Sequence, residues 1–286
     1  MPNILVTGAN GQLGSELKHL SSLYPNNTFV FTDVNNLDIC NHKFVKQFIL
    51  KNSIHTIINC AAYTAVDKAE EQFELSNDIN NLAVKNFASI AKEYNIKFVH
   101  ISTDYVFDGT NHMPYQETDK PNSQSVYGAT KLAGENAIIT INPHNTIIIR
   151  TSWVYSNYGN NFVKTMLRLS NERNELGVIV DQIGTPTYAR DLAKTILEIL
   201  PKINNENVEL FHYSNEGICS WYDFAIAIFQ IAGINIKVNP IETLQYPTAA
   251  KRPFYSILNK NKIKNKFNIE IPNWRDSLTN CLKKDV

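Results

Sequence analysis

A turn marked by three glycines, directly after the first apolar run, constrains the fold of this chain more than any other feature. Gly8, Gly11 and Gly14 follow the run 4–7 and open a segment with helical periodicity. One glycine permits a tight turn, a second lets the backbone approach a pyrophosphate, and a third lets helix and strand pack closely. The helix that follows offers unpaired N–H groups at its N-terminus. The turn predicts a dinucleotide-binding sheet, although a glycine-rich turn without a ligand is the alternative.

The first half of the chain alternates short apolar runs with longer helical patterns. Alternation at this spacing predicts an α/β fold, a Rossmann-type doubly wound parallel sheet with helices on both faces. We expect this domain to span residues 1–150 and to continue into parts of 151–235. Asn41 is a candidate N-cap for one helix. The predicted strands are 4–7, 28–33, 56–60, 98–102 and 146–150, and the predicted helices are 12–23, 43–51, 79–93 and 126–140.

The pattern loosens after Thr151. Helices are predicted at 160–170, 189–200 and 221–232, and strands at 176–180 and 210–213. The tail from Asn239 carries four prolines and is expected to be more irregular. We interpret residues 151–286 as mainly a smaller C-terminal substrate lobe, folded over the ligand edge of the sheet.

Composition excludes several function classes. The 27 Lys and Arg residues balance 27 Asp and Glu residues, so nothing indicates a nucleic-acid partner or a polybasic membrane anchor. No stretch approaches the roughly 18 apolar residues of a membrane span, and no signal peptide is recognisable. The four cysteines are scattered and the histidines lack metal-ligand spacing, so we expect no metal site. A cytoplasmic location is the expectation.

Asp33 closes the second predicted strand, 19 residues beyond Gly14. An acidic residue at that place accepts hydrogen bonds from the ribose hydroxyls of a dinucleotide. Because a carboxylate repels a 2′-phosphate, the position favours NADH over NADPH; an ordinary polar strand end is the other interpretation. After the third predicted strand, the small residues of Ala61-Ala62-Tyr63 let the chain pass close under the cofactor.

Tyr127 and Lys131 form a Y-x-x-x-K pattern, and on a helix they share one face. Hydride delivered to a carbonyl leaves negative charge on its oxygen, which a positioned acid must protonate. A tyrosine has a pKa of about 10, which a nearby ammonium lowers. Thr103 follows the fourth predicted strand, 24 residues before Tyr127, where its hydroxyl can hydrogen-bond the same oxygen. We therefore predict a catalytic set of Thr103, Tyr127 and Lys131.

Longer segments resemble one family, the dTDP-4-dehydrorhamnose reductases, a branch of the extended short-chain dehydrogenases/reductases. Residues 102–109 read S-T-D-Y-V-F-D-G, 127–135 read Y-G-A-T-K-L-A-G-E, and 150–155 read R-T-S-W-V-Y. Residues 64–67, 160–167, 181–187 and 252–258 also match, so the resemblance spans Gly8 to Leu258. It implies reduction of the 4-keto group of dTDP-4-dehydro-L-rhamnose, by NADH or NADPH, to dTDP-L-rhamnose.

The resemblance also implies roles for single residues. Thr103 and Asp104 would contact the sugar, and Trp153 would pack on it, unless Trp153 is a core tryptophan. Arg252 could pair with the diphosphate, or be a surface cation. Asp38 and Ile39 resemble the segment that contacts the adenine. The full set expected to bind the cofactor is Gly8, Asn10, Gly11, Gln12, Leu13, Gly14, Asp33, Asp38, Ile39, Ala61, Ala62, Tyr63, Tyr127 and Lys131.

Some members of the family dimerise through magnesium held by glutamates. Glu16 stands at one such place, but the other reads Tyr188-Ala189-Arg190. Because the positive charge of an arginine repels a magnesium ion, we expect a monomer or a weak homodimer without a magnesium bridge.

Two other functions fit the same pattern. A nucleotide-sugar epimerase or dehydratase of this fold would keep its cofactor through a full cycle. A catalytically silent binding or regulatory subunit would share the fold, since fold does not establish function. Such relatives usually lose the tyrosine or the lysine, and this chain has both.

Overall fold

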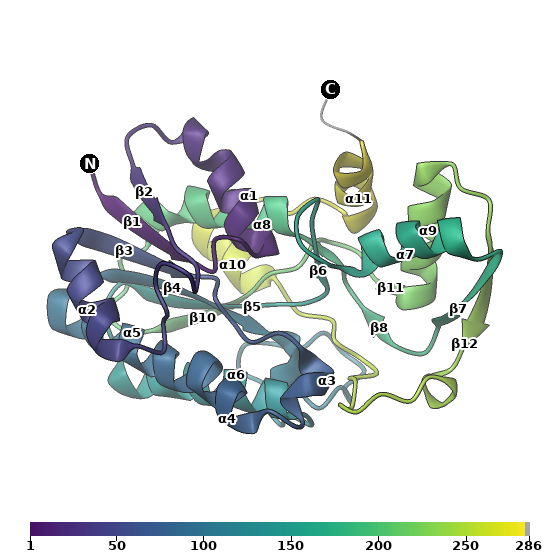
Figure 1. Cartoon of the computed structure of the whole chain (residues 1–286), viewed down its shortest axis with the longest axis horizontal. Helices are drawn as coiled ribbons and strands as arrows, with labels where there is room; N and C mark the ends of the chain where they lie inside the picture. Colours follow the sequence, from purple (N-terminus) through teal and green to yellow (C-terminus); the bar gives the residue numbers. More distant parts are fainter. Residues whose placement is uncertain (284–286) are drawn as a thin grey trace.

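A six-stranded parallel sheet forms the centre of the protein (Figure 1). The computed structural model describes residues 1–283. The strands run in the order β10-β5-β4-β3-β1-β2, and every neighbouring pair is parallel. Chain order reverses between β1 and β3, which is where the ligand crevice of such a sheet opens. The strands are β1 (Asn3–Thr7), β2 (Thr28–Phe31), β3 (Ile54–Asn59), β4 (Lys97–Thr103), β5 (Thr146–Thr151) and β10 (Glu209–His212).

Helices cover both faces because alternate strand residues point to opposite sides. In β1, Ile4 and Val6 pack into one core cluster and Leu5 into the other. The first cluster takes side chains from α1 (Gln12–Leu20), α8 (Ala189–Ile199) and α10 (Asn261–Phe267). The second takes side chains from α2 (His42–Lys51), α5 (Ala83–Tyr94) and α6 (Val126–Ile141).

The other elements from the second half build a smaller lobe, which Figure 1 shows to one side of the six-stranded sheet. Its core joins Phe224 and Ile228 to Trp274 and Leu278. The helices of the lobe are α7 (Phe162–Glu172), α9 (Trp221–Ala232) and α11 (Trp274–Leu282). Its strand pairs are β7 (Glu175–Ile179) with β12 (Lys237–Ile241), β6 (Val154–Tyr155) with β9 (Thr187–Tyr188), and β8 (Ile183–Gly184) with β11 (Cys219–Ser220).

The predicted Rossmann-type fold is confirmed, and the N-cap at Asn41 accepts a hydrogen bond from the N–H of Phe44. The predicted helical stretch 79–93 is helical throughout, as a π-helical turn (η2, Asp78–Leu82) that continues into α5. One local prediction was wrong. The tail is more regular than expected: it contains β12, α10 and α11, and α10 packs on the sheet. Within residues 1–283 no helix is long and apolar enough to cross a membrane.

Candidate active site

The glycine turn leaves an open cradle at the end of β1. Gly8 has φ +63°, and a β-carbon on it would lie 2.7 Å from the Cα of Ala61. A β-carbon on Gly14 would overlap the backbone of Gly8 and Ala9. Gly11 is the N-cap of α1 and brings no side chain to cap the first N–H groups. The turn therefore fits a pyrophosphate, which would take up those donors.

Asp33 is fixed at the rim of this cradle. Its carboxylate accepts hydrogen bonds from the backbone N–H of Asn10 at 2.9 Å and of Val34 at 2.8 Å. Two backbone donors leave lone pairs of the carboxylate free for ribose hydroxyls. Asp38 is exposed, whereas Ile39 is only 8% exposed and packs into the core under α2. Adenine contact by these two residues stays a prediction.

Asn80 holds the small-residue segment under the crevice. From the π-helical turn its side chain accepts the N–H of Tyr63 at 2.9 Å and donates to the Tyr63 carbonyl at 3.1 Å. The same amide donates to Thr130 on α6 at 3.2 Å. The segment Ala61–Tyr63 is thereby tied to the helix that carries Tyr127.

Tyr127 lies in the first turn of α6, where Ser125 caps the helix by accepting the N–H of Gly128. Its ring meets the ring of Tyr105 edge-on, with centroids 5.4 Å apart. Burial raises the pKa of the phenol, and a hydrogen bond with the Thr103 hydroxyl opposes that rise. The phenol therefore faces the end of β4, as the crevice geometry requires.

Lys131 lies one turn further along α6 and is 2% exposed. Its Nζ donates to the carbonyl of Ile101 at 2.6 Å and lies 3.4 Å from Nε2 of His100. Burial lowers the pKa of the ammonium to about 8. The expectation that this ammonium lowers the pKa of Tyr127 is not met, since burial keeps that pKa raised and the ammonium is bound to β4.

Asp104 follows Thr103 and is buried beside it. The Thr103 hydroxyl donates to Oδ1 of Asp104 at 3.0 Å. Within the described chain, Oδ2 of Asp104 and the Ser256 hydroxyl are both buried without a hydrogen-bond partner of ordinary geometry. Burial raises the pKa of the carboxyl to about 7. Unpaired polar atoms of this kind fit a ligand that carries hydroxyl groups.

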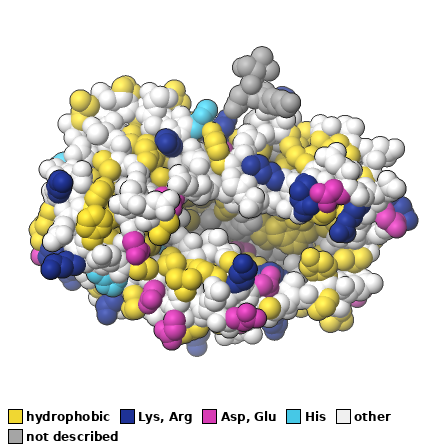
Figure 2. All heavy atoms as spheres, in the orientation of Figure 1, with side chains coloured by type: hydrophobic (Ala, Val, Ile, Leu, Met, Phe, Trp, Pro, Cys, Tyr) yellow, Lys and Arg dark blue, Asp and Glu magenta, His cyan; other side chains and the backbone are white. Residues whose placement is uncertain are grey.

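A cavity of about 790 Å³ opens beside this cluster, between the sheet and the lobe. Its lining includes Trp153 and Arg252, the two residues expected at the substrate, but not Tyr127 or Lys131. Tyr105, which touches both Tyr127 and the cavity, connects the two regions. Figure 2 shows hydrophobic side chains gathered in a recess of this face, with Lys and Arg side chains along its border.

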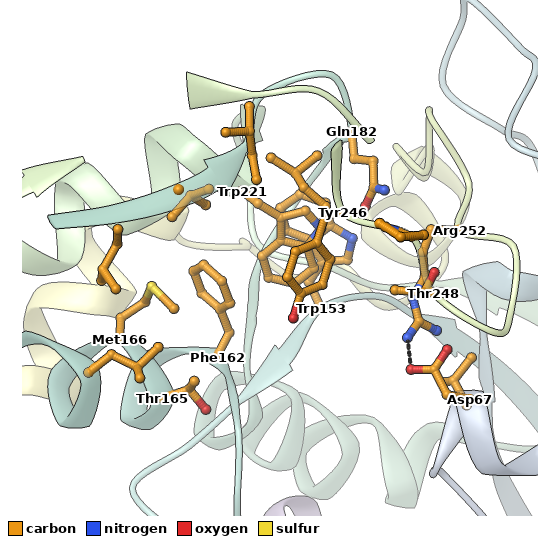
Figure 3. Close-up of a pocket in the computed structure, with 18 of the residues that line it drawn as sticks. Asp67, Trp153, Phe162, Thr165, Met166, Gln182, Trp221, Tyr246, Thr248 and Arg252 are labelled. Carbon is orange, nitrogen blue, oxygen red and sulfur yellow. Dashed lines mark hydrogen bonds and ion pairs between the residues drawn. The ribbon is translucent and has the colours of Figure 1, made fainter. Parts of the chain in front are cut away.

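Trp153 forms one wall of the cavity in an unusual backbone conformation. Its φ of +49° is sparsely populated for a bulky residue, and such strain concentrates at functional sites. The indole stacks on Trp221 with centroids 3.5 Å apart and an interplanar angle of 7°. Phe162 of α7 packs on Trp221 in turn, at 4.6 Å (Figure 3). Trp153 is therefore part of an aromatic stack that faces the cavity.

Arg252 reaches the cavity from the C-terminal segment and forms an ion pair with Asp67. The distance from Nη2 to Oδ2 is 2.5 Å, and the pair is visible as a dashed line in Figure 3. Nη1 lies 3.5 Å from the Tyr105 hydroxyl. Asp67 belongs to α3 (Val66–Ala69), so the pair joins two segments far apart in sequence. Contact of Arg252 with a diphosphate stays a prediction.

Glu16 and Arg190 lie at the two positions where some family members hold a bridging magnesium. In this structure they form an ion pair with each other. Nε of Arg190 lies 2.8 Å from Oε2 of Glu16, and the Ser156 hydroxyl donates to Oε1 at 2.6 Å. Among residues 1–283 no group of three or more His, Cys, Asp and Glu side chains could hold a metal ion.

Sequence reasoning missed four residues of this region: Asp67, Asn80, His100 and Trp221. Asp67 had a signal, because it ends the segment 64–67 that resembles the reductases. The other three sit within ordinary strand or helix patterns, and only their tertiary contacts distinguish them.

The comparisons with known proteins cover the whole chain. The family model described as RmlD substrate binding domain matches residues 2–286. The dTDP-4-dehydrorhamnose reductase of Aggregatibacter actinomycetemcomitans is 44% identical, with 98% of each chain covered. A solved dTDP-4-dehydrorhamnose reductase from Clostridium acetobutylicum is 45% identical, with 98% of each chain covered and a TM-score of 0.92. One from Bacillus anthracis, solved in complex with NADP, is 40% identical, covers 98% of this chain and 99% of its own, and has a TM-score of 0.93. The chain therefore belongs to the RmlD family.

Proposed function

We propose that this protein reduces the 4-keto group of dTDP-4-dehydro-L-rhamnose to give dTDP-L-rhamnose, with a reduced nicotinamide dinucleotide as the hydride source. One arrangement carries the proposal: Tyr127, whose phenol pKa the Thr103 hydroxyl at the end of β4 opposes in its rise, packs edge-on against Tyr105. Tyr105 in turn lines a cavity with Trp153 and Arg252 in its walls. The names of the relatives, at 40–45% identity over nearly the full length, support it.

Tyr127 would act as the proton donor. When bound, the reduced nicotinamide ring supplies the hydride to the carbonyl carbon. Because burial raises its pKa, the Tyr127 phenol keeps its proton until the carbonyl oxygen becomes negative. The Thr103 hydroxyl, which donates to Asp104 in the free protein, would turn its proton to that oxygen and stabilise the charge that develops on it. Lys131 would bind the ribose next to the nicotinamide.

The cavity walls would position the sugar nucleotide. The face of Trp153 provides an apolar wall for a deoxysugar, and Asp104 offers an unpaired carboxyl oxygen to a sugar hydroxyl. Arg252 would pair with the diphosphate. Its guanidinium would then either bind Asp67 and the diphosphate together or release Asp67.

NADH is our proposed cofactor, with NADPH as the alternative. The Asp33 carboxylate at the rim of the cradle favours the ribose hydroxyls of NADH over a 2′-phosphate. The relative from Bacillus anthracis was solved with NADP, so both cofactors must be compared. A kcat/KM that is higher with NADPH would contradict the preference for NADH.

The proposal is tested by mixing the purified protein with dTDP-4-dehydro-L-rhamnose and either cofactor. Loss of absorbance at the reduced-nicotinamide band is expected, and no oxidation of either cofactor would refute the proposal. Tyr127→Phe should lose most of kcat and still bind cofactor, while Tyr94→Phe, a half-exposed tyrosine on α5, should keep full activity. Stoichiometric NAD in the purified protein would instead indicate an epimerase or dehydratase.

We further propose a monomer or a weak homodimer without bridging magnesium. The Arg190–Glu16 ion pair supports this, because the guanidinium already compensates the buried carboxylate. Sedimentation with and without magnesium tests it, and a dimer that dissociates with EDTA would refute it. The cytoplasmic location stays a prediction.

A further inference from the structure

A buried row of polar side chains runs beneath the catalytic helix. It starts at Lys131, passes His100 of β4 and Asn59 of β3, and ends at Thr7 of β1. Nε2 of His100 lies 3.4 Å from the Lys131 Nζ, and Nδ1 lies 3.1 Å from the Asn59 amide. The other atom of that amide contacts the Thr7 hydroxyl at 2.6 Å. None of the four residues is more than 2% exposed, so water does not compete for these contacts.

His100 is a neutral ring in this row. Burial, and secondarily the charge of Lys131, lower its pKa well below the ordinary value. A neutral imidazole has one nitrogen that donates and one that accepts. The hydrogen bonds on its two sides are therefore linked. If Nε2 donates toward Lys131, Nδ1 must accept from Asn59, and if Nε2 accepts, Nδ1 must donate.

The structure shows one of the two possible arrangements. The Asn59 amide nitrogen donates to Nδ1, and its oxygen accepts from the Thr7 hydroxyl. Nε2 then carries the proton and faces Lys131 as a donor, which suits a neutral amine. An ammonium has only donors, so it requires Nε2 to accept and Nδ1 to carry the proton. That second arrangement turns the Asn59 amide over, with its oxygen toward His100.

We propose that His100 is a positioning residue for Lys131, and that its tautomer changes with the charge of Lys131 and passes the change to Asn59 at the end of β3. Thr7 precedes Gly8 and Asn59 precedes the segment 60–63, so the row ends under the cradle that would receive the cofactor. The positioning role rests on the proposed reductase function, while the tautomer change can be measured without any activity.

Asp104, with a carboxyl pKa of about 7, titrates in the same cluster, but the charges that act on Lys131 are those of Glu135 and Cys60. Burial raises the pKa of the Cys60 thiol to about 12 and also raises that of Tyr127. Glu135, one turn along α6, is bound to Arg150. A proton that leaves the row near pH 8 is therefore assigned to Lys131.

The direct test is ¹⁵N NMR of histidine-labelled protein between pH 6 and 10. His100 and His212 are both fully buried, and His212→Gln removes one set of buried signals and assigns the other. We expect His100 to carry its proton on Nδ1 at pH 6 and on Nε2 at pH 10, with the change centred near the titration of Lys131. One tautomer across the whole range would overturn the proposal, whether or not the protein reduces the keto-sugar.

Two variants test the positioning role. His100→Phe keeps the ring volume and removes both nitrogens, whereas the amide of His100→Gln can present either its oxygen or its nitrogen to Lys131. A hydrogen bond from an ammonium is stronger than one from an amine, so the loss of Nε2 should lower the pKa of Lys131. We expect the alkaline limb of the kcat/KM profile to move down by about one pH unit in His100→Phe and to return in His100→Gln. Loss of thermal stability with an unmoved limb would assign His100 a structural role only and refute the proposal.

Discussion

Gly184 and Trp153 lie so close that a β-carbon on Gly184 would come within 2.6 Å of Cε2 of the indole. The opposite constraint comes from Trp221, whose ring stacks on the same indole. Trp153 therefore has one position, fixed by the absence of a side chain at residue 184 and the presence of a large one at residue 221. The strained backbone of Trp153 is held by these neighbours.

Gly184→Ala should damage substrate binding without touching the cofactor. The added methyl group pushes the indole toward the cavity, and a distorted apolar wall typically costs 10-fold or more, roughly 1–3 kcal/mol. We expect KM for the keto-sugar to rise about 10-fold, measured by steady-state kinetics, with the Kd for NADH unchanged. Gly233→Ala is the control: its φ of +68° makes alanine costly to stability, but the residue ends α9 and does not line the cavity, so KM should stay unchanged. Equal KM values for the two variants would contradict the role of Gly184.

The ion pair of Arg252 with Asp67 predicts opposite effects for its two members. Arg252→Gln removes the cation available to a diphosphate, and charge-assisted hydrogen bonds contribute about 1.5–3 kcal/mol, so KM should rise roughly 10- to 100-fold. Asp67→Asn keeps an oxygen for the N–H of Ala250 but removes the competing charge, so KM should fall about 3-fold. Arg275→Gln, on the exposed side of α11, is the control and should leave KM unchanged. A fall in KM for Arg252→Gln would show that the arginine does not bind the diphosphate.

The parts of the fold that could be predicted are those encoded in local pattern. The helix 221–232 was predicted with the bounds that the structure gives α9, because Ser220 is an N-cap and Gly233 ends the helix. The sheet strands were located because their apolar runs are continuous. β12 was missed because it alternates weakly and contains Pro240, and it becomes a strand only by pairing with β7.

The residues of the site likewise fall into those that local sequence patterns indicate and those that only tertiary contacts bring together. Tyr127, Lys131 and Thr103 have fixed spacings along one strand and one helix, so the sequence indicates them. Trp221 is 68 residues from Trp153, and Arg252 is 185 residues from Asp67. No local spacing relates such pairs, since only the tertiary packing of the folded chain brings them together. The direction of the Lys131 side chain, toward β4 and His100, depended on burial that a helix pattern does not report.

Asp104 predicts a pH dependence of stability. Burial raises its pKa from 3.8 to about 7, so between these values the folded protein binds more protons than the unfolded chain, and stability falls as pH rises. The full difference corresponds to roughly 4 kcal/mol. Asp104→Asn removes this penalty, and urea unfolding should show it more stable than the parent at pH 8 but not at pH 4. Asp276→Asn, exposed in the first turn of α11, removes only a favourable charge at the helix N-terminus, so it should never be more stable than the parent and should lose at most about 1 kcal/mol at pH 8. An Asp104→Asn advantage that does not grow with pH would contradict the assignment.

Breaking the buried ion pair between Glu135 of α6 and Arg150 of β5 should cause a large loss of stability next to the catalytic residues. Nη2 of Arg150 lies 2.6 Å from Oε2 of Glu135, Ser102 donates to the same carboxylate, and the two side chains are 3% and 0% exposed. Breaking a buried pair leaves an uncompensated charge, which costs about 3–5 kcal/mol. Glu135→Gln should therefore lower the free energy of unfolding by that amount and loosen α6 from β5. Glu172→Gln, which removes an exposed pair with Arg168 on α7, should cost only about 0.3–0.5 kcal/mol. Similar losses in the two variants would mean that Arg150 finds compensation elsewhere, and that the pair does not fix the helix carrying Tyr127 and Lys131.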